Sequence, residues 1–495
     1  MKIFKKYIVI TLTAAALFNA IGCKKEFLEI VPKGQAIAIN TSDYENILNA
    51  NYITSQFTAN VYLGDEMAAI QPGFNNMPAE RGRRYRRLFQ YEDRVYNADQ
   101  LPDEVTDADN YIRKLYLFNK VINEVMDAQG GTESQKLSIL AEAKVGRAIC
   151  NFMFLSDFTK PYNQTTAATD LGIPNLTVAD VTQKDFKRGT LQQAYDLILS
   201  DLKSSLPNLN ILTHRRKISR LAAEFYLARV YMAMNNYPEA KIHVDAAFEE
   251  VSKSVIPMAL YDYTVVLNPD DQDVPGTWFP DFGFGLMGEP LAVNNTQTIY
   301  NVTCRWFDPV SVDGIVFSPQ TASLYAATDR RLNLYTTYSY SEDAEYPLSM
   351  RRRNTGFFTG IDVGPSIADL YLMRAECNAR ANNLSEAVSD LQILRTKRIP
   401  GSAAQVPTAV ASDQQALVRF ILDERIREFA ISGLRWLDMR RLSQDPVYNN
   451  HIKLDHKVYN QAGTVVSTYT LRPERYALKF GERMLNESNG LEENP

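Results

Sequence analysis

The chain has 495 residues, which is enough for one large domain or for two to three smaller ones. Hydrophobic residues make up 45% and charged residues 22%, so a sizeable core is expected. The formal net charge of −5 argues against non-specific nucleic-acid binding. Aromatic residues reach 11%, which leaves rings available for a binding surface.

The N-terminus has the pattern of a lipoprotein signal. Lysines among the first six residues precede an apolar stretch that is too short to span a bilayer comfortably. Small residues then lead to Cys23 in a sequence like a lipobox. We expect residues 1–22 to be a signal peptide and residues 23–42 a lead-in anchored by acyl chains on Cys23. An ordinary secretory signal followed by an unmodified cysteine is the alternative.

The remaining cysteines and the histidines suggest no metal or catalytic site. Cys150, Cys304 and Cys377 are widely spaced and lack CxxC motifs, so neither zinc nor a disulfide framework is indicated. Cys150 and Cys377 are expected to be buried small hydrophobes. The four histidines form no HExxH motif, and there is no G-x-S-x-G motif. We therefore expect no cofactor, no metal and no enzymatic activity.

Residues 71–110 are rich in Pro, Gly, Asn and Asp and are predicted to form a loop. Within them, residues 81–87 hold five arginines in seven positions. These form either a solvated basic turn paired with nearby acids (Glu80, Glu92 and Asp93) or a docking patch for an anionic sugar or peptide. In the second case Arg84 and Tyr85 are candidate ligand contacts.

Helical spacing returns at residues 111–126, 133–157 and 191–202, with Thr190 as a predicted N-cap. Two later stretches have the pattern of tetratricopeptide repeats. Small residues at Ala228 and Ala240 mark the first. The second spans residues 369–397, with Ala375 and Ala387 at matching separations. Because the two copies are far apart in sequence, we expect other helical segments to cover their faces.

Residues 257–365 interrupt the helical pattern. Pro, Gly, Asn and Asp are frequent, and short strands are predicted at 296–302 and 334–340. A long irregular insertion of this kind is uncommon unless it binds something.

Aromatic side chains in this insertion are the main ligand-binding candidates. Trp278, Phe282 and Trp306 lie among Gly, Pro, Asn and Asp residues. Sugar faces pack on aromatic rings while amides and carboxylates bond their hydroxyls, but such rings also serve to cover a core. Residues 283–288 spell G-x-G-x-x-G without the strand and helix that dinucleotide binding requires, so that function is not indicated.

Residues 421–442 combine an apolar helix stripe with nine charges of both signs. Leu422, Phe429 and Trp436 fall on the stripe, and Gly433 predicts a break between two short helices. Periodicity alone leaves two interpretations open, a solvated charged face and a structural signature.

This segment resembles the "RR-EF-GH-RW-DLRR" signature of the SusD/RagB family, although Leu434 replaces the usual His. The matching residues include Arg427, Glu428, Phe429, Gly433, Arg435, Trp436, Asp438 and Arg440. Their charges are expected to tie helices together and to perform no chemistry. Residues 142–158 and 191–202 resemble two further helices of the family.

The resemblance implies a mainly α-helical, SusD-like domain at residues 43–495. Tetratricopeptide-like helix pairs would form a frame at about 43–256 and 366–445. An irregular, partly β insertion would occupy about 257–365, and a tail would follow from 446 to 495.

The resemblance also implies a non-catalytic lipoprotein of the outer membrane that faces the cell exterior. Such a protein captures oligosaccharide or polysaccharide and delivers it to a SusC-like TonB-dependent transporter. A RagB-like peptide-binding protein and, more remotely, a surface glycoside hydrolase are the alternatives. Binding positions vary between family members, so no family site residue is transferred to this chain.

Overall fold

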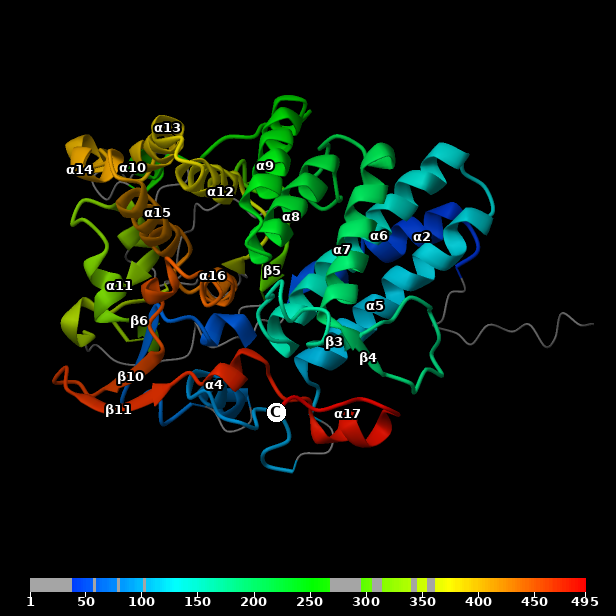
Figure 1. The fold of residues 1–495 in the computed structure, drawn as a ribbon, viewed down its shortest axis with the longest axis horizontal. Helices are drawn as coiled ribbons and strands as arrows, with labels where there is room; N and C mark the ends of the chain where they lie inside the picture. Colours follow the sequence, from blue (N-terminus) through cyan, green and yellow to red (C-terminus); the bar gives the residue numbers. More distant parts are fainter. Residues whose placement is uncertain are drawn as a thin grey trace, which may run out of the picture.

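The computed structural model describes residues 38–56, 59–77, 81–100, 104–267, 295–304, 314–339, 345–353 and 361–495 (Figure 1). Cys23 lies outside these ranges. Within them the protein is mainly helical with small sheets, as the sequence predicts. None of the described helices has both the length and the apolar character needed to cross a bilayer.

Most of the frame consists of long helices that pack against their neighbours along the chain. These are α2 (Thr41–Leu48), α5 (Asp107–Glu124), α6 (Glu133–Phe158), α7 (Leu191–Ser205), α8 (Arg220–Ala233), α9 (Tyr237–Ser252), α12 (Ile367–Arg380), α13 (Leu384–Thr396), α15 (Gln414–Phe429) and α16 (Leu434–Leu442). Shorter helices are α3 (Asn51–Thr54), α4 (Arg81–Phe89), α10 (Tyr263–Val266), α11 (Pro319–Ser323), α14 (Thr408–Ala411) and α17 (Glu482–Glu487).

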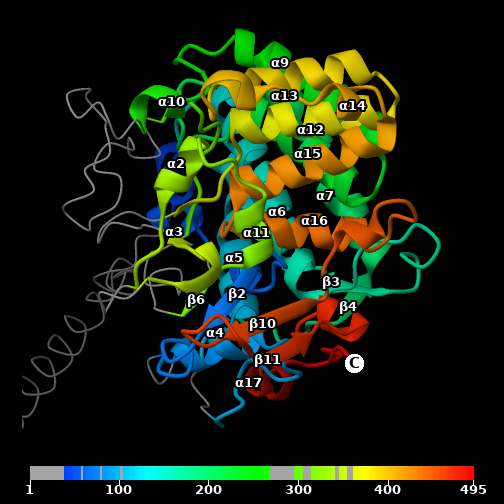
Figure 2. The same cartoon turned by 90° about the vertical axis from the view of Figure 1, so that its left-hand side faces the viewer.

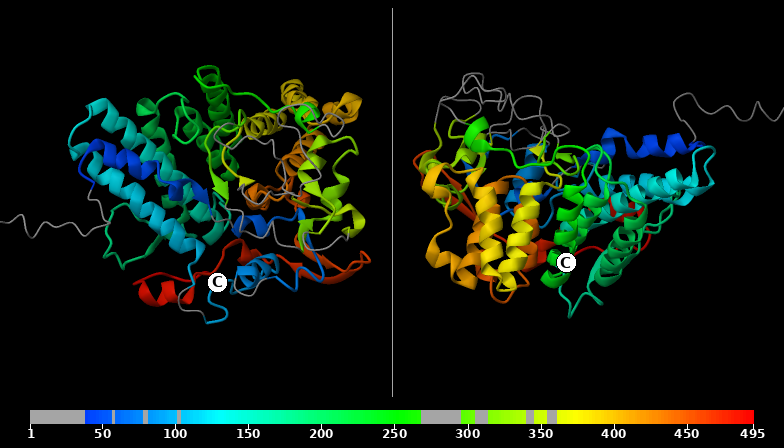
Figure 3. Two further views of the ribbon diagram at one scale, coloured as in Figure 1. Left: turned by 180° about the vertical axis from the view of Figure 1, so that it is seen from behind. Right: turned by 90° about the horizontal axis from the view of Figure 1, so that it is seen from above.

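The two predicted repeat units are confirmed as the helix pairs α8–α9 and α12–α13. Ala228, Ala240, Ala375 and Ala387 are fully buried, which lets the paired helices approach closely. The two units also pack directly on each other, because α9 contacts α12. Figure 3 shows α12–α13 (yellow) toward one end of the frame, α8–α9 (green) in the middle and α2 lying across α5 and α6 at the other end. Each repeat unit is therefore covered partly by the other unit and partly by the other helices that contact it.

Two helix boundaries follow the local sequence. The Thr190 side chain accepts a hydrogen bond from the backbone N–H of Gln193, so the predicted N-cap of α7 is confirmed. Gly433 has a φ of +83° and separates α15 from α16, as expected of a residue without a Cβ.

Eleven short strands are described. They are β1 (Ser55–Gln56), β2 (Met67–Ile70), β3 (Leu171–Pro174), β4 (Arg188–Thr190), β5 (Thr303–Cys304), β6 (Ile315–Phe317), β7 (Tyr335–Thr336), β8 (Arg352–Arg353), β9 (Ile361–Asp362), β10 (Asp455–Tyr459) and β11 (Val465–Thr470). The sheet orders are β11-β10-β2-β6, β1-β5-β9, β3-β4 and β7-β8.

The strands of the insertion are shorter than predicted. Residues 296–302 contain only an isolated bridge, between Thr298 and Ser366, and β5 begins just after them. The Asn295 side chain bonds the backbone N–H of Gln297 and forms a local turn that competes with strand pairing. In the second predicted stretch, β7 covers only residues 335–336.

The prediction of a loop throughout residues 71–110 is wrong, because α4 forms within them and α5 begins before they end. Tyr85, Leu88 and Phe89 are buried on one side of α4 at helical spacing, so this short stripe stabilises it against the core. The high density of arginine masked that signal. The expected pairing with acids is found mainly with Asp99, which contacts Arg83 at 3.1 Å and Arg87 at 2.7 Å.

Most of the charges of residues 421–442 are buried, Asp423 being the partly exposed exception, so the interpretation as a solvated helix face is wrong. Glu424 pairs with Arg331 at 2.8 Å and with Arg427 at 2.7 Å. Burial by itself raises the pKa of Glu424. Its arginine partners, Arg331 foremost, lower the pKa by more than burial raises it, so the net pKa is well below the ordinary value. Glu428 extends this cluster to Arg398 at 2.7 Å.

A second cluster joins α15, α16 and α12. Arg425 contacts Asp438 at 2.8 Å and Asp369 at 2.6 Å, while Arg441 contacts Glu376 at 2.6 Å. All five side chains are buried. The helices α12, α13 and α15 lie side by side in Figure 2. The signature segment therefore ties helices together, as its resemblance to the family implies.

Trp436 fills the core beside this second cluster. Its side chain is fully buried, stacks on Tyr476 at a centroid distance of 5.2 Å, and donates a hydrogen bond to the Ser156 carbonyl at 3.0 Å. We expect Trp436→Ala to lower the free energy of unfolding by about 3–5 kcal/mol, because it leaves a large cavity. Chemical denaturation measures this change, and Trp436→Phe should lose less. Wild-type-like melting of Trp436→Ala would contradict the core assignment.

The burial of Glu66 predicts that the stability of the protein depends on pH. The side chain of Glu66 is buried, and its Oε1 accepts the Ile431 N–H at 3.3 Å. Burial, together with the neighbouring Asp65, raises its pKa from 4.5 to about 8. Between these values the folded protein binds more protons than the unfolded chain, so the free energy of unfolding falls as pH rises.

Glu66→Gln imitates the protonated side chain and should remove this dependence. We expect the stability of the variant relative to wild type to increase by about 2–4 kcal/mol from about pH 5 to about pH 9. Denaturant unfolding of both proteins across this range measures the difference. A difference that stays constant with pH would show that Glu66 ionises normally.

Candidate functional site

The structure locates only part of the predicted ligand-binding set. Trp278, Phe282 and Trp306 lie outside the described residues, and their ligand role stays a prediction. Tyr85 and Arg84 are described, and both lie on α4.

Tyr85 belongs to the core side of α4. It is buried and stacks on Tyr62 at a centroid distance of 4.6 Å. The guanidinium of Arg84 lies over the Tyr85 ring and donates a hydrogen bond to the Val105 carbonyl at 3.3 Å. Both side chains thus have structural contacts, and their role in ligand binding stays a prediction.

One of the connections between the insertion and the frame is a short ribbon of paired segments. β5 lies between β1 and β9, and Trp306 follows β5 by two residues in sequence. Further along the ribbon, Ile299 donates a backbone hydrogen bond to Pro365 and Ala259 to Thr296. Residues 295–304 and 361–365 therefore pair as one ribbon beside the start of α12.

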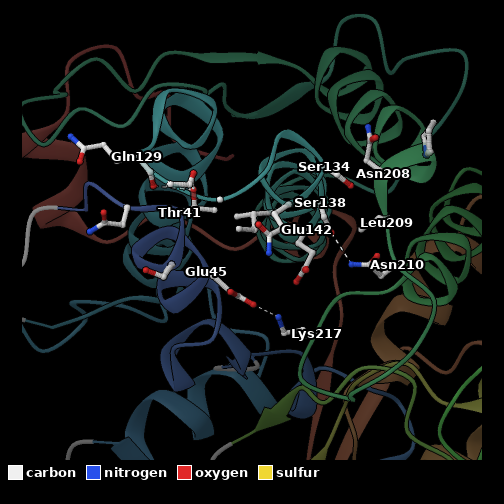
Figure 4. Close-up of a pocket in the computed structure, with 17 residues that line it drawn as sticks. Thr41, Glu45, Gln129, Ser134, Ser138, Glu142, Asn208, Leu209, Asn210 and Lys217 are labelled. Atoms are coloured by element: carbon white, nitrogen blue, oxygen red, sulfur yellow. Dashed lines mark hydrogen bonds and ion pairs between the residues drawn. The ribbon is translucent and has the colours of Figure 1, made fainter.

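A polar cavity of about 730 Å³ lies between α2, the α5–α6 turn, α6 and the segment Pro207–Asn210 (Figure 4). Five amide and four hydroxyl side chains line it, together with Glu45, Glu142 and Lys217. Aromatic side chains are absent from this described lining. Its volume is within the usual range for small-molecule sites, but its lining is more polar than most of them.

Hydrogen bonds hold the walls of this cavity in place. The Thr41 hydroxyl on α2 donates to the Gly130 carbonyl in the α5–α6 turn at 2.7 Å. Asn210 donates to the Ser138 hydroxyl on α6 at 2.9 Å. The Lys217 ammonium pairs with Glu45 of α2. Each wall is thus attached to a neighbouring wall through its own polar side chains.

The described lining of the cavity contains two carboxyl groups, and that of Glu142 is the one without an ion-pair partner of its own, because Lys217 pairs with Glu45. The half-buried carboxylate of Glu142 lies among Glu45, Lys217 and Asn210 in Figure 4 and accepts the backbone N–H of Ile218. Burial raises its pKa to about 7, although the nearby Lys217 ammonium opposes this increase. The carboxyl group is therefore partly protonated near neutral pH.

Sequence reasoning missed this cavity. Its lining comes from separate segments around residues 40, 130, 140 and 210, and none of these carries a motif of its own. Amphipathic spacing placed Glu142 on a helix but did not show which segments would face it.

All four histidines have structural partners. His214 accepts the backbone N–H of Arg216 at 3.1 Å. His243 bonds Glu224 at 2.7 Å, His451 bonds Asp423 at 2.9 Å, and His456 is buried with its Nδ1 2.8 Å from the Phe89 carbonyl. Burial lowers the pKa of His456. In the described part of the chain, no three His, Cys, Asp or Glu side chains are grouped to hold a metal ion. Cys150 and Cys377 are buried, as expected.

Family models match the chain at both ends. The SusD family model matches residues 367–495, and a model described as starch-binding associating with outer membrane matches residues 26–232. The insertion lies in the stretch between these matches.

Two curated relatives come from Formosa agariphila. SusD-like protein P38 is 23% identical over 55% of this chain, and the match spans 62% of that protein's length. SusD-like protein P2 is 25% identical over 74% of this chain and 78% of its own length.

Solved structures share the fold over almost the whole chain. A SusD superfamily protein from Bacteroides thetaiotaomicron covers 92% of this chain and 100% of its own with a TM-score of 0.69 and 18% identity. A SusD-like carbohydrate binding protein from Bacteroides vulgatus has a TM-score of 0.64 and 16% identity, covering 92% and 97%. Surface glycan-binding protein A from Bacteroides uniformis has a TM-score of 0.59 and 13% identity, covering 92% and 99%.

Two family models match the chain, and it shares its fold with SusD superfamily structures. The buried charges of the signature segment and the paired helices of the frame agree with these matches. This chain therefore belongs to the SusD family.

Proposed function

We propose that this protein is a lipid-anchored, non-catalytic binding protein on the outer face of the outer membrane. It captures oligosaccharide or polysaccharide and delivers it to a SusC-like TonB-dependent transporter. The observation that carries the proposal is the SusD frame itself, shared over more than nine-tenths of the chain with proteins described as carbohydrate-binding and glycan-binding. A matching family model is also described by starch binding at the outer membrane.

Aromatic side chains of the insertion are the proposed sugar contacts. The C–H groups of a sugar face pack well on the rings of Trp278, Phe282 and Trp306, and these residues have amide and carboxylate neighbours in the sequence. The pairing of β5 with β1 supports this assignment, because it attaches this part of the chain to the helical frame. Binding loops carried by such a frame are a common arrangement.

A RagB-like peptide-binding protein remains the alternative. Its main support in the sequence was the arginine cluster of α4. In the structure Arg83 and Arg87 pair with Asp99, and Arg86 donates to the Asn75 carbonyl at 3.1 Å. These guanidinium groups already have partners, which favours a sugar over an anionic peptide at this surface.

The family assignment agrees with the expectation that the chain is not an enzyme. His243, His451 and His456 are held by neighbouring carboxylates or carbonyls and His214 by a backbone N–H, an arrangement that suits structural roles. A surface glycoside hydrolase would instead release reducing ends from a bound glycan.

Substitution of the tryptophans tests the proposed sugar site. We expect Trp278→Ala and Trp306→Ala each to weaken glycan binding roughly tenfold or more, with little change in melting temperature, because a stacking surface is lost and the core is untouched. Calorimetric titration against a panel of plant and algal oligosaccharides measures the change, and wild type should retain these glycans intact.

Two results would contradict this assignment. Loss of folding in both variants would place the rings in the core. The appearance of new reducing ends during incubation of the wild-type protein would indicate a hydrolase.

Labelling and isolation of the wild-type protein and of Cys23→Ala test the lipid anchor and the transporter partner together. We expect wild-type protein in its native host to incorporate a clickable palmitate analogue, to sediment with outer membranes and to co-purify with a TonB-dependent transporter. Cys23→Ala should lose the label and leave the membrane fraction, because no acyl chain then holds it there. Label that persists in the variant would refute acylation at Cys23, and wild-type protein isolated without a transporter would refute the partnership.

A further inference from the structure

We propose that the polar cavity between α2, α6 and residues 207–210 is a second binding site, distinct from the aromatic insertion, for a neutral hydroxyl-rich ligand such as a short oligosaccharide. The choice of a sugar rests on the proposed function. The location of the site rests only on the geometry of the cavity.

The lining has the chemistry that a neutral polyol requires. Each sugar hydroxyl both donates and accepts hydrogen bonds, as do the amide and hydroxyl side chains that dominate the wall. Ser134, Ser138 and Asn210 come from two opposed walls. A volume of about 730 Å³ accommodates more than one sugar ring.

The site is organised before any ligand binds. Thr41 connects α2 to Gly130, and Asn210 connects its segment to Ser138 on α6. The Thr132 side chain caps α6 through the backbone N–H of Gln135, which fixes the first turn of the wall. A ligand therefore meets walls that need little reordering, which reduces the entropic cost of binding.

The charges of the cavity select against anions. Lys217 is its one cation among the described lining residues, and it is already paired with Glu45. Glu142 contributes a second carboxyl group. The nearest positive charge, the Lys217 ammonium, is shared between Glu142 and Glu45. A uronate or a sulfated sugar would be repelled, whereas a sugar hydroxyl would donate to Glu142.

The absence of aromatic side chains from this lining separates the site from the proposed one in the insertion. Ring stacking tolerates many sugars, but hydrogen bonds to the edge of a sugar depend on the configuration of its hydroxyls. The cavity is therefore expected to discriminate between sugars of the same size.

A steric block tests the location. Ser134 is an exposed residue in the first turn of α6, so Ser134→Trp fills the cavity without entering the core. Ser385→Trp is the matched control, because Ser385 is equally exposed and occupies the same position in the first turn of α13. The probes are maltotriose, cellotriose, laminaritriose and xylotriose, with ligand-observed NMR and calorimetry as readouts.

We expect wild type to bind at least one of these trisaccharides, and Ser134→Trp to weaken that binding roughly tenfold or more while Ser385→Trp leaves it unchanged. Equal losses in both variants, or no binding to any probe, would overturn the inference. If Trp306→Ala abolishes binding and Ser134→Trp has no effect, the cavity is not a site and the proposed function stands.

The pH dependence of binding provides a second readout. The charged groups that face Glu142 are Glu45 from α2 and Lys217 from the segment before α8. An ionised carboxylate accepts a hydroxyl more strongly than a protonated one, so affinity should rise from about pH 6 to about pH 8. Glu142→Gln should bind without this pH dependence. A pH profile that is the same in both proteins would show that Glu142 does not contact the ligand.

Discussion

Glu424 and Asp438 are each held between arginines in the interior of the molecule, where an unpaired charge would cost several kcal/mol. Together with the pairs of Arg425 with Asp369 and of Arg441 with Glu376, they join α15 and α16 to α12 and to the insertion. A buried ion pair adds little net stability over an apolar substitute of the same shape. Its geometric demands can instead specify which helices meet and at what angle. We infer that the signature segment determines the arrangement of the frame more than its stability.

The same network reaches the insertion, where the sugar contacts are proposed. Arg331 lies in the insertion and pairs with both Asp329 and Glu424. Arg398 follows α13, pairs with Glu428, and donates to the Gln297 side chain at 2.6 Å. The ribbon of residues 295–304 and 361–365 is therefore attached to the buried ion pairs of the frame.

Frame, insertion and cavity have different physical roles in the proposed function. The clusters around Glu424 and Asp438 bury their charges in pairs, so these charges are unavailable to ligands. The cavity leaves polar groups facing a solvent-filled space, with Glu142 incompletely neutralised. The insertion contributes the aromatic residues that the cavity lacks. A glycan that meets stacking surfaces at one place and hydrogen-bonding groups at another would be retained by two weak contacts together, and it could be released when either is lost.

The sequence by itself determined the features that depend on neighbours along the chain: the paired helices with alanines at their crossings, the cap at Thr190, the break at Gly433 and the core position of Trp436. Local periodicity and backbone sterics suffice for these. The tertiary structure decided the rest. It buried the charges around Arg425 by bringing Asp369 and Glu376 to them, ordered α4 against the core, and assembled the cavity from four separate segments. No local pattern encodes such encounters, because each depends on which distant segments meet.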